Sequence, residues 1–317
     1  MSISNIVIWQ YQACACLFLA TLLASLVVCP TACARTPPPS RETAASVSEA
    51  CPLPPLSSFQ FSGPPISLKL KNASGLTWHD ERKTLWLVSN KPPIVYELTS
   101  SGKILQSFPL KDVTDPEGIC WLGGSRFAIV EEQAARLRIF GLSEAGKLIE
   151  EPENSFQVDN PKSTIVDRRR NNPQTCGLEG LTYDISKGIF WIAKEKKPIR
   201  MYRIKYTSET GAILLPEPWP NLAWRVKDVS GLYWCPLRKR LWVLSDQSAV
   251  VIELDENGIV VDNLPLLIEE FPKRSSHVTA GEWLEDAEGI TLDDEGKLYI
   301  CCEPNLLYRL IPKEVKH

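Results

Sequence analysis

Short hydrophobic runs separated by turn-forming residues follow one another from about residue 59 to residue 311. In the first complete repeat the runs cover residues 76–78, 85–88 and 94–98, and a Gly-containing turn leads into a fourth run at Ile104. No long helical periodicity competes with this pattern. Three or four short strands, a turn and a repetition are typical of the blades of a β-propeller. We therefore predict an all-β protein with a propeller fold.

Each repeat opens with a small or acidic residue followed by glycine. The five pairs are Ser74-Gly75, Glu117-Gly118, Glu179-Gly180, Ser230-Gly231 and Glu288-Gly289. A blade needs about 40 residues, so no interval between consecutive pairs holds two blades. The pattern predicts five blades, and a sixth stays open if a degenerate blade lies within residues 150–176. The last repeat lacks an obvious fourth strand, and we expect residues 59–70 to supply it and to close the ring.

A second polar position recurs 15 or 16 residues after the first residue of each pair. It is occupied by Asn90, Glu132, Glu195, Asp246 and Glu303. In a propeller the first strand of a blade is innermost and the second runs antiparallel to it, so both positions face one mouth of the central channel. The position two residues before each pair adds further oxygen ligands. It holds Asn72, Asp115, Asp228 and Asp286, with Gly177 as the exception.

These side chains predict a cation site. Carboxylates that are packed near one axis repel each other, and a bound cation relieves that repulsion. Oxygen ligands without His or Cys suit Ca²⁺, which takes six to eight oxygens in a tolerant geometry. The candidate ligands are Glu117, Glu132, Glu179, Glu195, Asp246, Glu288 and Glu303.

The three positions together offer more carboxylates than one ion needs. Either a second ion binds, or nearby basic residues such as Lys194, Arg136 or Arg200 neutralise part of the charge. In the alternative interpretation, the polar side chains only cap strand ends and bridge neighbouring blades.

Other catalytic chemistry has little support in the sequence. The three histidines, His79, His277 and His317, have no zinc-site spacing. The chain contains no G-x-S-x-G elbow, P-loop or G-x-G-x-x-G motif. We expect the tryptophans within the strands to pack between blades, and the cysteines outside the N-terminal segment to be buried thiols. The sequence has no C-x-x-C motif.

Composition and the N-terminus indicate an exported globular protein. The chain has 317 residues, 44% of them hydrophobic, and a net charge of -3, which gives no footprint for nucleic acid. Residues 1–34 are apolar and end in Ala32-Cys33-Ala34, which indicates a signal peptide, with a lipoprotein signal or a membrane anchor as alternatives. Residues 35–58 are predicted to be a Pro/Ser-rich tether, and residues 59–317 one propeller domain. The predicted location is the periplasm or cell envelope, whether secreted or anchored.

The repeat motifs resemble those of the SdiA-regulated domain family, extracytoplasmic propellers distantly similar to NHL-repeat proteins. The matching stretches, in chain order, begin with Asp115-Pro116-Glu117-Gly118, Gly177-Leu178-Glu179-Gly180, Asp228-Val229-Ser230-Gly231 and Ala287-Glu288-Gly289, and each is followed by its second-strand partner around Glu132, Glu195, Asp246 and Glu303. The resemblance implies a five-bladed propeller with a calcium site and no established activity.

Three functions remain open at this point. The first is a calcium-binding module for an unknown ligand or an envelope protein, acting as a monomer. The second is a metal-dependent hydrolase of the phosphoesterase or lactonase type, in which Glu132, Glu195 or Glu303 acts as base and Lys194 contacts an anionic group. The third is an interaction scaffold without an ion.

Overall fold

The computed structural model describes residues 53–159, 177–207, 209–219, 224–268 and 282–313. The predicted signal segment and residues 35–52 of the predicted tether lie outside the described residues. Among the residues that are described, no helix is long and apolar enough to cross a membrane. Leu53 and Leu56 fall within the stretch predicted as tether, yet both side chains are buried. The packed part of the chain therefore includes the last residues before Phe59.

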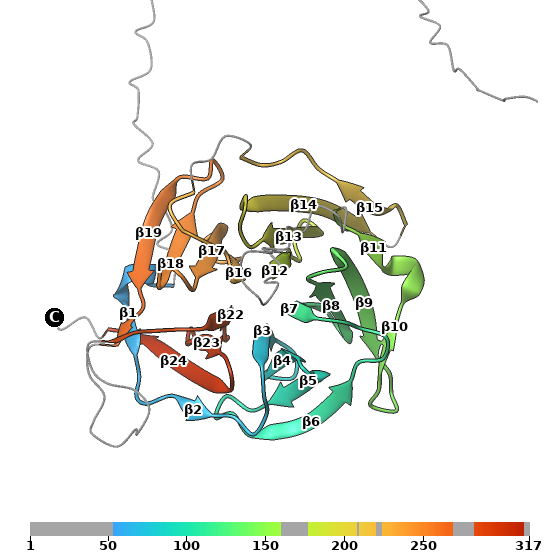
Figure 1. Cartoon of the computed structure of the whole chain (residues 1–317), viewed down its shortest axis with the longest axis horizontal. Coiled ribbons are helices and arrows are strands. Elements are labelled where there is room, and N and C mark those ends of the chain that lie inside the picture. Colours follow the sequence, from blue (N-terminus) through green and yellow to red (C-terminus); the bar gives the residue numbers. More distant parts are fainter. Residues whose placement is uncertain (1–52, 160–176, 208, 220–223, 269–281, 314–317) are drawn as a thin grey trace, which may run out of the picture. The chain divides into compact units, whose positions relative to one another are not determined.

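Five sheets surround a central axis, and the innermost strand of each carries the glycine of a predicted pair (Figure 1). The first blade contains β3 (Ala73–His79), β4 (Thr84–Asn90), β5 (Pro93–Leu98) and β6 (Ile104–Pro109). The second contains β7 (Pro116–Gly123), β8 (Arg126–Glu131), β9 (Arg136–Leu142) and β10 (Leu148–Glu150), with β11 (Phe156–Gln157) also paired to β9.

The remaining blades follow the same antiparallel order. The third contains β12 (Leu178–Asp184), β13 (Ile189–Lys194), β14 (Arg200–Thr207) and β15 (Gly211–Leu214). The fourth contains β16 (Gly231–Cys235), β17 (Arg240–Ser245), β18 (Val250–Leu254) and β19 (Val260–Pro265). The fifth contains β22 (Ala287–Leu292), β23 (Leu298–Cys302), β24 (Leu306–Pro312) and β1 (Phe59–Phe61), with β2 (Ile66–Ser67) also paired to β24. A short hairpin, β20 (Leu267–Ile268) and β21 (Glu282–Trp283), and two 3₁₀ turns, η1 (Leu56–Ser58) and η2 (Pro152–Asn154), complete the described elements.

The predicted five-bladed propeller is confirmed. Residues 150–159, where a degenerate sixth blade was left open, instead extend the second blade through β11. The predicted closure of the ring is also confirmed, since β1 pairs antiparallel with β24 and places Phe59 opposite Pro312. Each blade therefore has at least four strands, and the ring joins the two ends of the folded chain.

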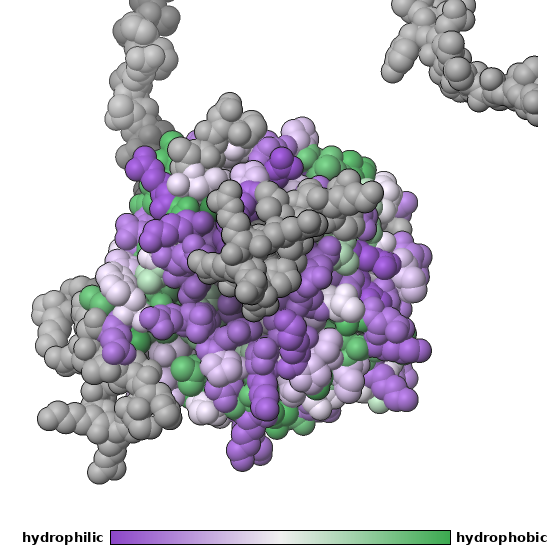
Figure 2. Space-filling view, in the orientation of Figure 1, coloured by the Kyte–Doolittle hydropathy of each residue, from purple (hydrophilic) through white to green (hydrophobic). Residues whose placement is uncertain are grey.

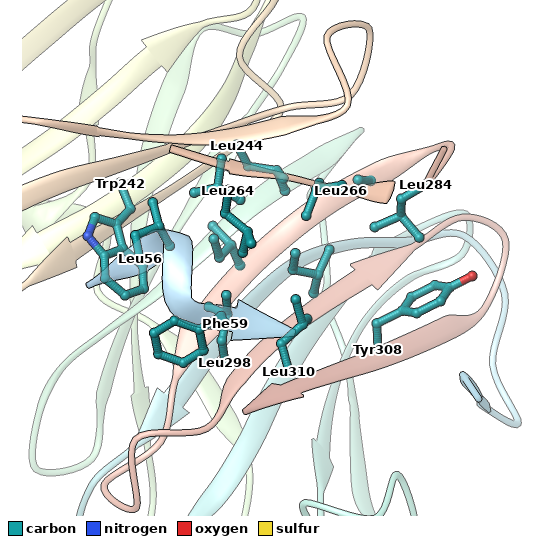
Figure 3. Close-up of a cluster of buried hydrophobic side chains, with 14 of the residues drawn as sticks. Leu56, Phe59, Trp242, Leu244, Leu264, Leu266, Leu284, Leu298, Tyr308 and Leu310 are labelled. Atoms are coloured by element: carbon teal, nitrogen blue, oxygen red, sulfur yellow. The ribbon is translucent and has the colours of Figure 1, made fainter. Parts of the chain in front are cut away.

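The seam between the fourth and fifth blades carries the largest buried cluster around this closure (Figure 3). Phe59 packs edge-on against Trp242, with ring centroids 6.1 Å apart. Leu56 from η1 and Leu310 from β24 are fully buried in the same cluster. Burial of each such side chain stabilises the fold by about 1.5–3 kcal/mol, so β1 contributes packing as well as backbone hydrogen bonds. Over the described residues, the face of the molecule seen in Figure 2 is largely hydrophilic.

The start of the innermost strand is irregular in four of the five blades. The pairing register shifts between Ala73 and Gly75, and equivalent bulges follow Pro116, Leu178 and Ala287. A β-bulge leaves one residue unpaired and redirects its side chain. The unpaired residues are Ser74, Glu117, Glu179 and Glu288, the first members of the predicted pairs. In the fourth blade the ladder runs regularly from Gly231.

The glycine after each bulge allows neighbouring inner strands to approach closely. A Cβ atom at Gly118 would lie 2.5 Å from the carbonyl oxygen of Glu179, and one at Gly75 would lie 2.6 Å from that of Glu117. Real Cβ atoms do not approach backbone this closely, so any side chain would push the blades apart. Glycine at this position is what keeps the channel narrow.

Candidate metal centre

Three carboxylates from three blades line one small cavity on the channel. Glu117, Glu179 and Glu288 surround it together with Ser230, which holds the equivalent position in the fourth blade. The cavity measures about 10 Å³, room for roughly one water-sized species. The three side chains converge because the bulges aim them at the axis and the glycines bring their strands together.

The pKa values of all three carboxyls are raised. Burial raises the pKa of Glu117 to about 8, and the charges of Glu132 and Asp115 also act upward against a lowering hydrogen bond from Asn90. Burial followed by the charge of Glu288 raises the pKa of Glu179 well above its ordinary value. Glu288 is affected in the same way, by burial and then by Glu117. Without a cation, Glu117 holds a proton near neutral pH, and Glu179 and Glu288 take up protons more readily than exposed carboxyls, because all three are removed from water and repel one another.

The second polar position forms an outer ring that connects adjacent blades. Glu132 Oε1 accepts a hydrogen bond from the Gly177 amide of the third blade at 2.9 Å. Asp246 Oδ1 accepts one from the Ala287 amide of the fifth blade at 3.1 Å. Asn90 Nδ2 donates to Glu117 Oε1 at 3.0 Å. These three side chains bridge blades, as the alternative interpretation predicted, while they also lie beside the inner carboxylates.

In the second blade, an inner carboxylate lies close to a member of the outer ring. Asp115, Glu117 and Glu132 each offer a carboxylate oxygen, and these oxygens lie within 4.8 Å of one another. Asp115 holds the position two residues before its pair and was not among the predicted ligands. Its other contacts are a 2.7 Å hydrogen bond from Gln133 and an ion pair with Lys91 at 3.4 Å.

Three buried oxygens of this region have no hydrogen-bond partner among the described residues. They are Asn90 Oδ1, Asp115 Oδ1 and Ser230 Oγ. Buried acceptors without a partner cost roughly 1–3 kcal/mol each, and a cation satisfies them directly. Carboxylate, amide and hydroxyl oxygens with no nitrogen or sulfur ligand are the donor set of a hard ion such as Ca²⁺. The residues present therefore fit calcium.

The remaining predicted ligands, Glu195 and Glu303, do not line the inner cavity. Glu195 is buried and forms an ion pair with its neighbour Lys196. Burial and then the charge of Asp286 raise the pKa of Glu303, whose charge in turn raises the pKa of Glu288. Glu303 thus acts on the inner group electrostatically.

The position two residues before each pair holds residue types that suit its backbone conformation. The sequence analysis did not recognise this reason. Asn72, Asp115 and Asp286 have φ angles of 52°, 53° and 54°, in the left-handed region that Asn and Asp tolerate best. Asp228 is buried and accepts a 2.5 Å hydrogen bond from Ser245, so it holds the turn of its own blade. This position supplies turn geometry first, and a ligand oxygen in the second blade.

Two basic residues that the sequence analysis did not name also act on the carboxyls. Arg136 forms an ion pair with Glu150 at 3.9 Å. The cations that lower carboxyl pKa values here are Lys196, which acts on Glu179, and Lys91, which acts on Glu303. Lys194 is buried at the end of β13. Lys91 and Lys196 directly follow members of the outer ring, which is the sequence signal that could have identified them.

Comparisons with known proteins agree with this architecture. A family model described as SdiA-regulated matches residues 57–311. Among solved structures, the chain is similar to a gluconolactonase from Xanthomonas campestris, with 13% identity over 78% of this chain and 89% of that one and a TM-score of 0.47. It is also similar to a streptogramin B lyase (12% identity, 80% and 98% covered, TM-score 0.44) and to a chain of a nidogen/laminin complex (11%, 73% and 72%, 0.44). At these identities the likenesses concern the fold alone.

Proposed function

This chain belongs to the SdiA-regulated family, and we propose that it is a calcium-binding β-propeller that is exported from the cytoplasm and serves as a binding module. Its ligand is a small molecule or an envelope protein, and it acts as a monomer. The single observation that carries the calcium proposal is the convergence of Glu117, Glu179 and Glu288 on one narrow cavity. An ion there offsets the mutual repulsion of three carboxylates that burial has removed from water.

Several contacts favour an ion that is held by protein oxygens. Asn90, Asp115 and Ser230 each contribute a buried oxygen without a hydrogen-bond partner among the described residues. The cavity of about 10 Å³ is far smaller than the roughly 300–1,000 Å³ of pockets that hold drug-sized ligands. An ion at this place stabilises the ring of blades, because its ligands come from β7, β12 and β22.

The export proposal rests on the N-terminal sequence. An apolar segment that ends in Ala32-Cys33-Ala34 precedes the Pro/Ser-rich stretch. Cys120, Cys235, Cys301 and Cys302 are buried thiols outside any disulfide, as predicted for the described cysteines. Buried thiols of this kind are inert.

The test is titration of the metal-stripped protein with Ca²⁺ in a calorimeter, together with metal analysis of the protein as purified. We expect saturable binding that is lost in a Glu179→Gln, Glu288→Gln double variant. Glu295→Gln is the matched control, since Glu295 is exposed and pairs with Lys297 on a surface turn. Absence of bound metal and of any calorimetric signal would refute the calcium site.

A hydrolase screen separates the binding module from the enzyme alternative. Phosphoester and lactone panels are offered to the calcium-loaded protein, and we expect no turnover. Hydrolysis that disappears in the double variant and persists in Glu295→Gln would assign the ion to catalysis instead.

A further inference from the structure

A second cavity opens at the opposite end of the inner strands. It measures about 140 Å³. It is lined by the residues two and three positions after the glycines of the five pairs, on β3, β7, β12, β16 and β22. In the first blade these residues are Thr77 and Trp78, and in the third they are Thr182 and Tyr183. The cavity therefore shares the strands of the metal centre but none of its residues.

Aromatic side chains from four blades form the walls. The first four blades each supply one ring, namely Trp78, Trp121, Tyr183 and Trp234. Tyr233 adds a second ring from the fourth blade. Two of the walls are held from behind by other rings. Trp121 packs against His79 with centroids 4.8 Å apart, and Trp234 stacks on Trp191 at 5.9 Å with an interplanar angle of 11°. Ligands that bind such supported rings lose little affinity to ordering of the site.

The polar groups of the cavity have unused hydrogen-bonding capacity. Trp78 is 8% exposed, and its buried Nε1 has no partner among the described residues. Thr77, Thr182 and Thr291 accept backbone hydrogen bonds from Trp121, Trp234 and Trp78 at 3.3, 2.9 and 3.0 Å. Their hydroxyl hydrogens remain available, because each Oγ1 serves here as an acceptor.

A carboxylate supplies the complementary acceptor. Asp80 lines the cavity from the turn between β3 and β4, and no described residue donates a hydrogen bond to it. The tyrosine ring of Tyr233 lies near it, since the charges of Asp80 and Asp293 add to burial in raising the pKa of Tyr233. The cavity thus combines apolar ring faces with both donors and an acceptor.

We propose that this cavity binds a single ring of a neutral carbohydrate, either a free sugar or the end of a glycan. The apolar C–H face of a sugar ring packs on the aromatic walls, and its hydroxyl groups accept from Trp78 Nε1 and donate to Asp80. The volume is below the roughly 300–1,000 Å³ of drug-sized sites, which suits one ring.

Charged ligands fit the same groups less well. A cation offers no acceptor to Trp78 Nε1. The Trp234 ring also has a cation beside it already, because Lys187 Nζ lies 5.8 Å from its centroid. An anion would meet the carboxylate of Asp80 and leave it without a donor. Only a ligand with both donors and acceptors satisfies the two sides.

The test uses the full chain and follows tryptophan fluorescence and ligand-observed NMR. The probes are the methyl pyranosides of glucose, galactose, mannose and N-acetylglucosamine, their β-linked disaccharides, and choline as the cationic probe. We expect at least one pyranoside to bind and choline not to bind. The comparison of monosaccharide with disaccharide separates a free sugar from a glycan end.

Matched variants locate the site. Trp78→Phe keeps a ring and removes the N–H, and a lost hydrogen bond weakens binding by about 2- to 10-fold. Trp283→Phe is the control, because Trp283 is 53% exposed and lies outside the cavity. Asp80→Asn, on an exposed turn, is expected to weaken binding without affecting folding.

The outcomes are independent of the calcium proposal. Sugar binding is expected to persist in the Glu179→Gln, Glu288→Gln double variant at a temperature where that variant is folded. Failure of every pyranoside to bind, binding of choline alone, or equal effects of Trp78→Phe and Trp283→Phe would overturn the carbohydrate site.

Discussion

The two ends of the channel use the same inner strands and carry different chemistry. At the start of these strands, Glu117, Glu179 and Glu288 point at one cavity of about 10 Å³. A few residues later, Trp78 and Trp121 line a cavity of about 140 Å³. The difference comes from the bulges. An unpaired bulge residue is turned toward the axis, whereas the regular pleat beyond it directs large side chains between blades, where they line the second cavity.

The comparison teaches that buried like charges oppose one another at one end, whereas packing and hydrogen bonds hold the other end together. Three carboxyls with raised pKa values oppose each other at the acidic end. At the aromatic end, stacked rings and inter-blade hydrogen bonds to threonine hold the walls in place. Changes at the two ends should therefore have separable effects on stability.

The largest expected effect is on thermal stability in calcium. A ligand at about 100 times its dissociation constant adds about 2.7 kcal/mol, which corresponds to a rise of roughly 5–10 °C in Tm. Glu179→Gln should remove most of this rise and should melt at or above the unchanged chain in chelator, because a buried glutamine is neutral without taking up a proton. Asp80→Asn should leave the calcium shift intact. Equal calcium shifts in Glu179→Gln and in the unchanged chain would contradict the assignment of the acidic end.

A smaller loss is expected when the inner strands are forced apart. In Gly118→Ala the new Cβ would lie 2.5 Å from the backbone oxygen of Glu179, so blades must move, at a cost of about 1–3 kcal/mol. Gly141→Ala is the control, because its Cβ would meet only the side-chain oxygen of Glu151, at 3.2 Å. Denaturant unfolding measures both variants. An equal cost at the two glycines would show that the close approach is not what matters.

The next effect is a pH dependence of the metal-free protein. The pKa of Glu117 is about 8 in the folded chain and near its ordinary value of 4.5 when unfolded. Between these values the folded state holds the extra proton, so stability falls as pH rises. Melts in chelator from pH 5.5 to 8.5 should show this decline, and Glu117→Gln should reduce it. Calcium affinity should rise over the same range, because binding displaces the proton. A decline that is unchanged in Glu117→Gln would assign it to other groups.

The smallest effect distinguishes the outer ring from the inner one. Asp246→Asn keeps an oxygen that accepts from the Ala287 amide, so stability in chelator should change by less than about 0.5 kcal/mol. Calcium affinity should fall less than in Glu288→Gln, whose carboxylate lines the cavity itself. Calorimetric titration of the two variants measures the ranking. A larger affinity loss in Asp246→Asn would move the ion toward the outer ring.

The sequence predicted the fold because the signals were local and periodic. The five Gly pairs marked the inner strands, and the run at residues 59–61 predicted the strand that closes the ring. The inner carboxylates were also predictable, because the bulge residue always precedes the glycine. The roles of Glu132 and Asp246 were not, since the backbone amides they accept from belong to other blades.

Two further features needed coordinates. Asn72, Asp115 and Asp286 read as ligands in sequence, although their left-handed backbone explains their residue type as well. The tryptophans read as inter-blade packing, which holds for Trp191 and Trp242. Trp78 and Trp121 pack between blades and also line a cavity, and no spacing in the sequence separates these two uses.

The strand β1 has a consequence for how the molecule is made. Ser62 and Arg309, which lie 247 positions apart in sequence, are hydrogen-bonded where the ends of the chain meet. Because synthesis begins at the N-terminus, β1 is made first, and the last sheet cannot be completed until residue 312 is available. Contacts of such long sequence separation slow folding. A partly synthesised chain therefore stays an open arc with an exposed edge until its last strands are made.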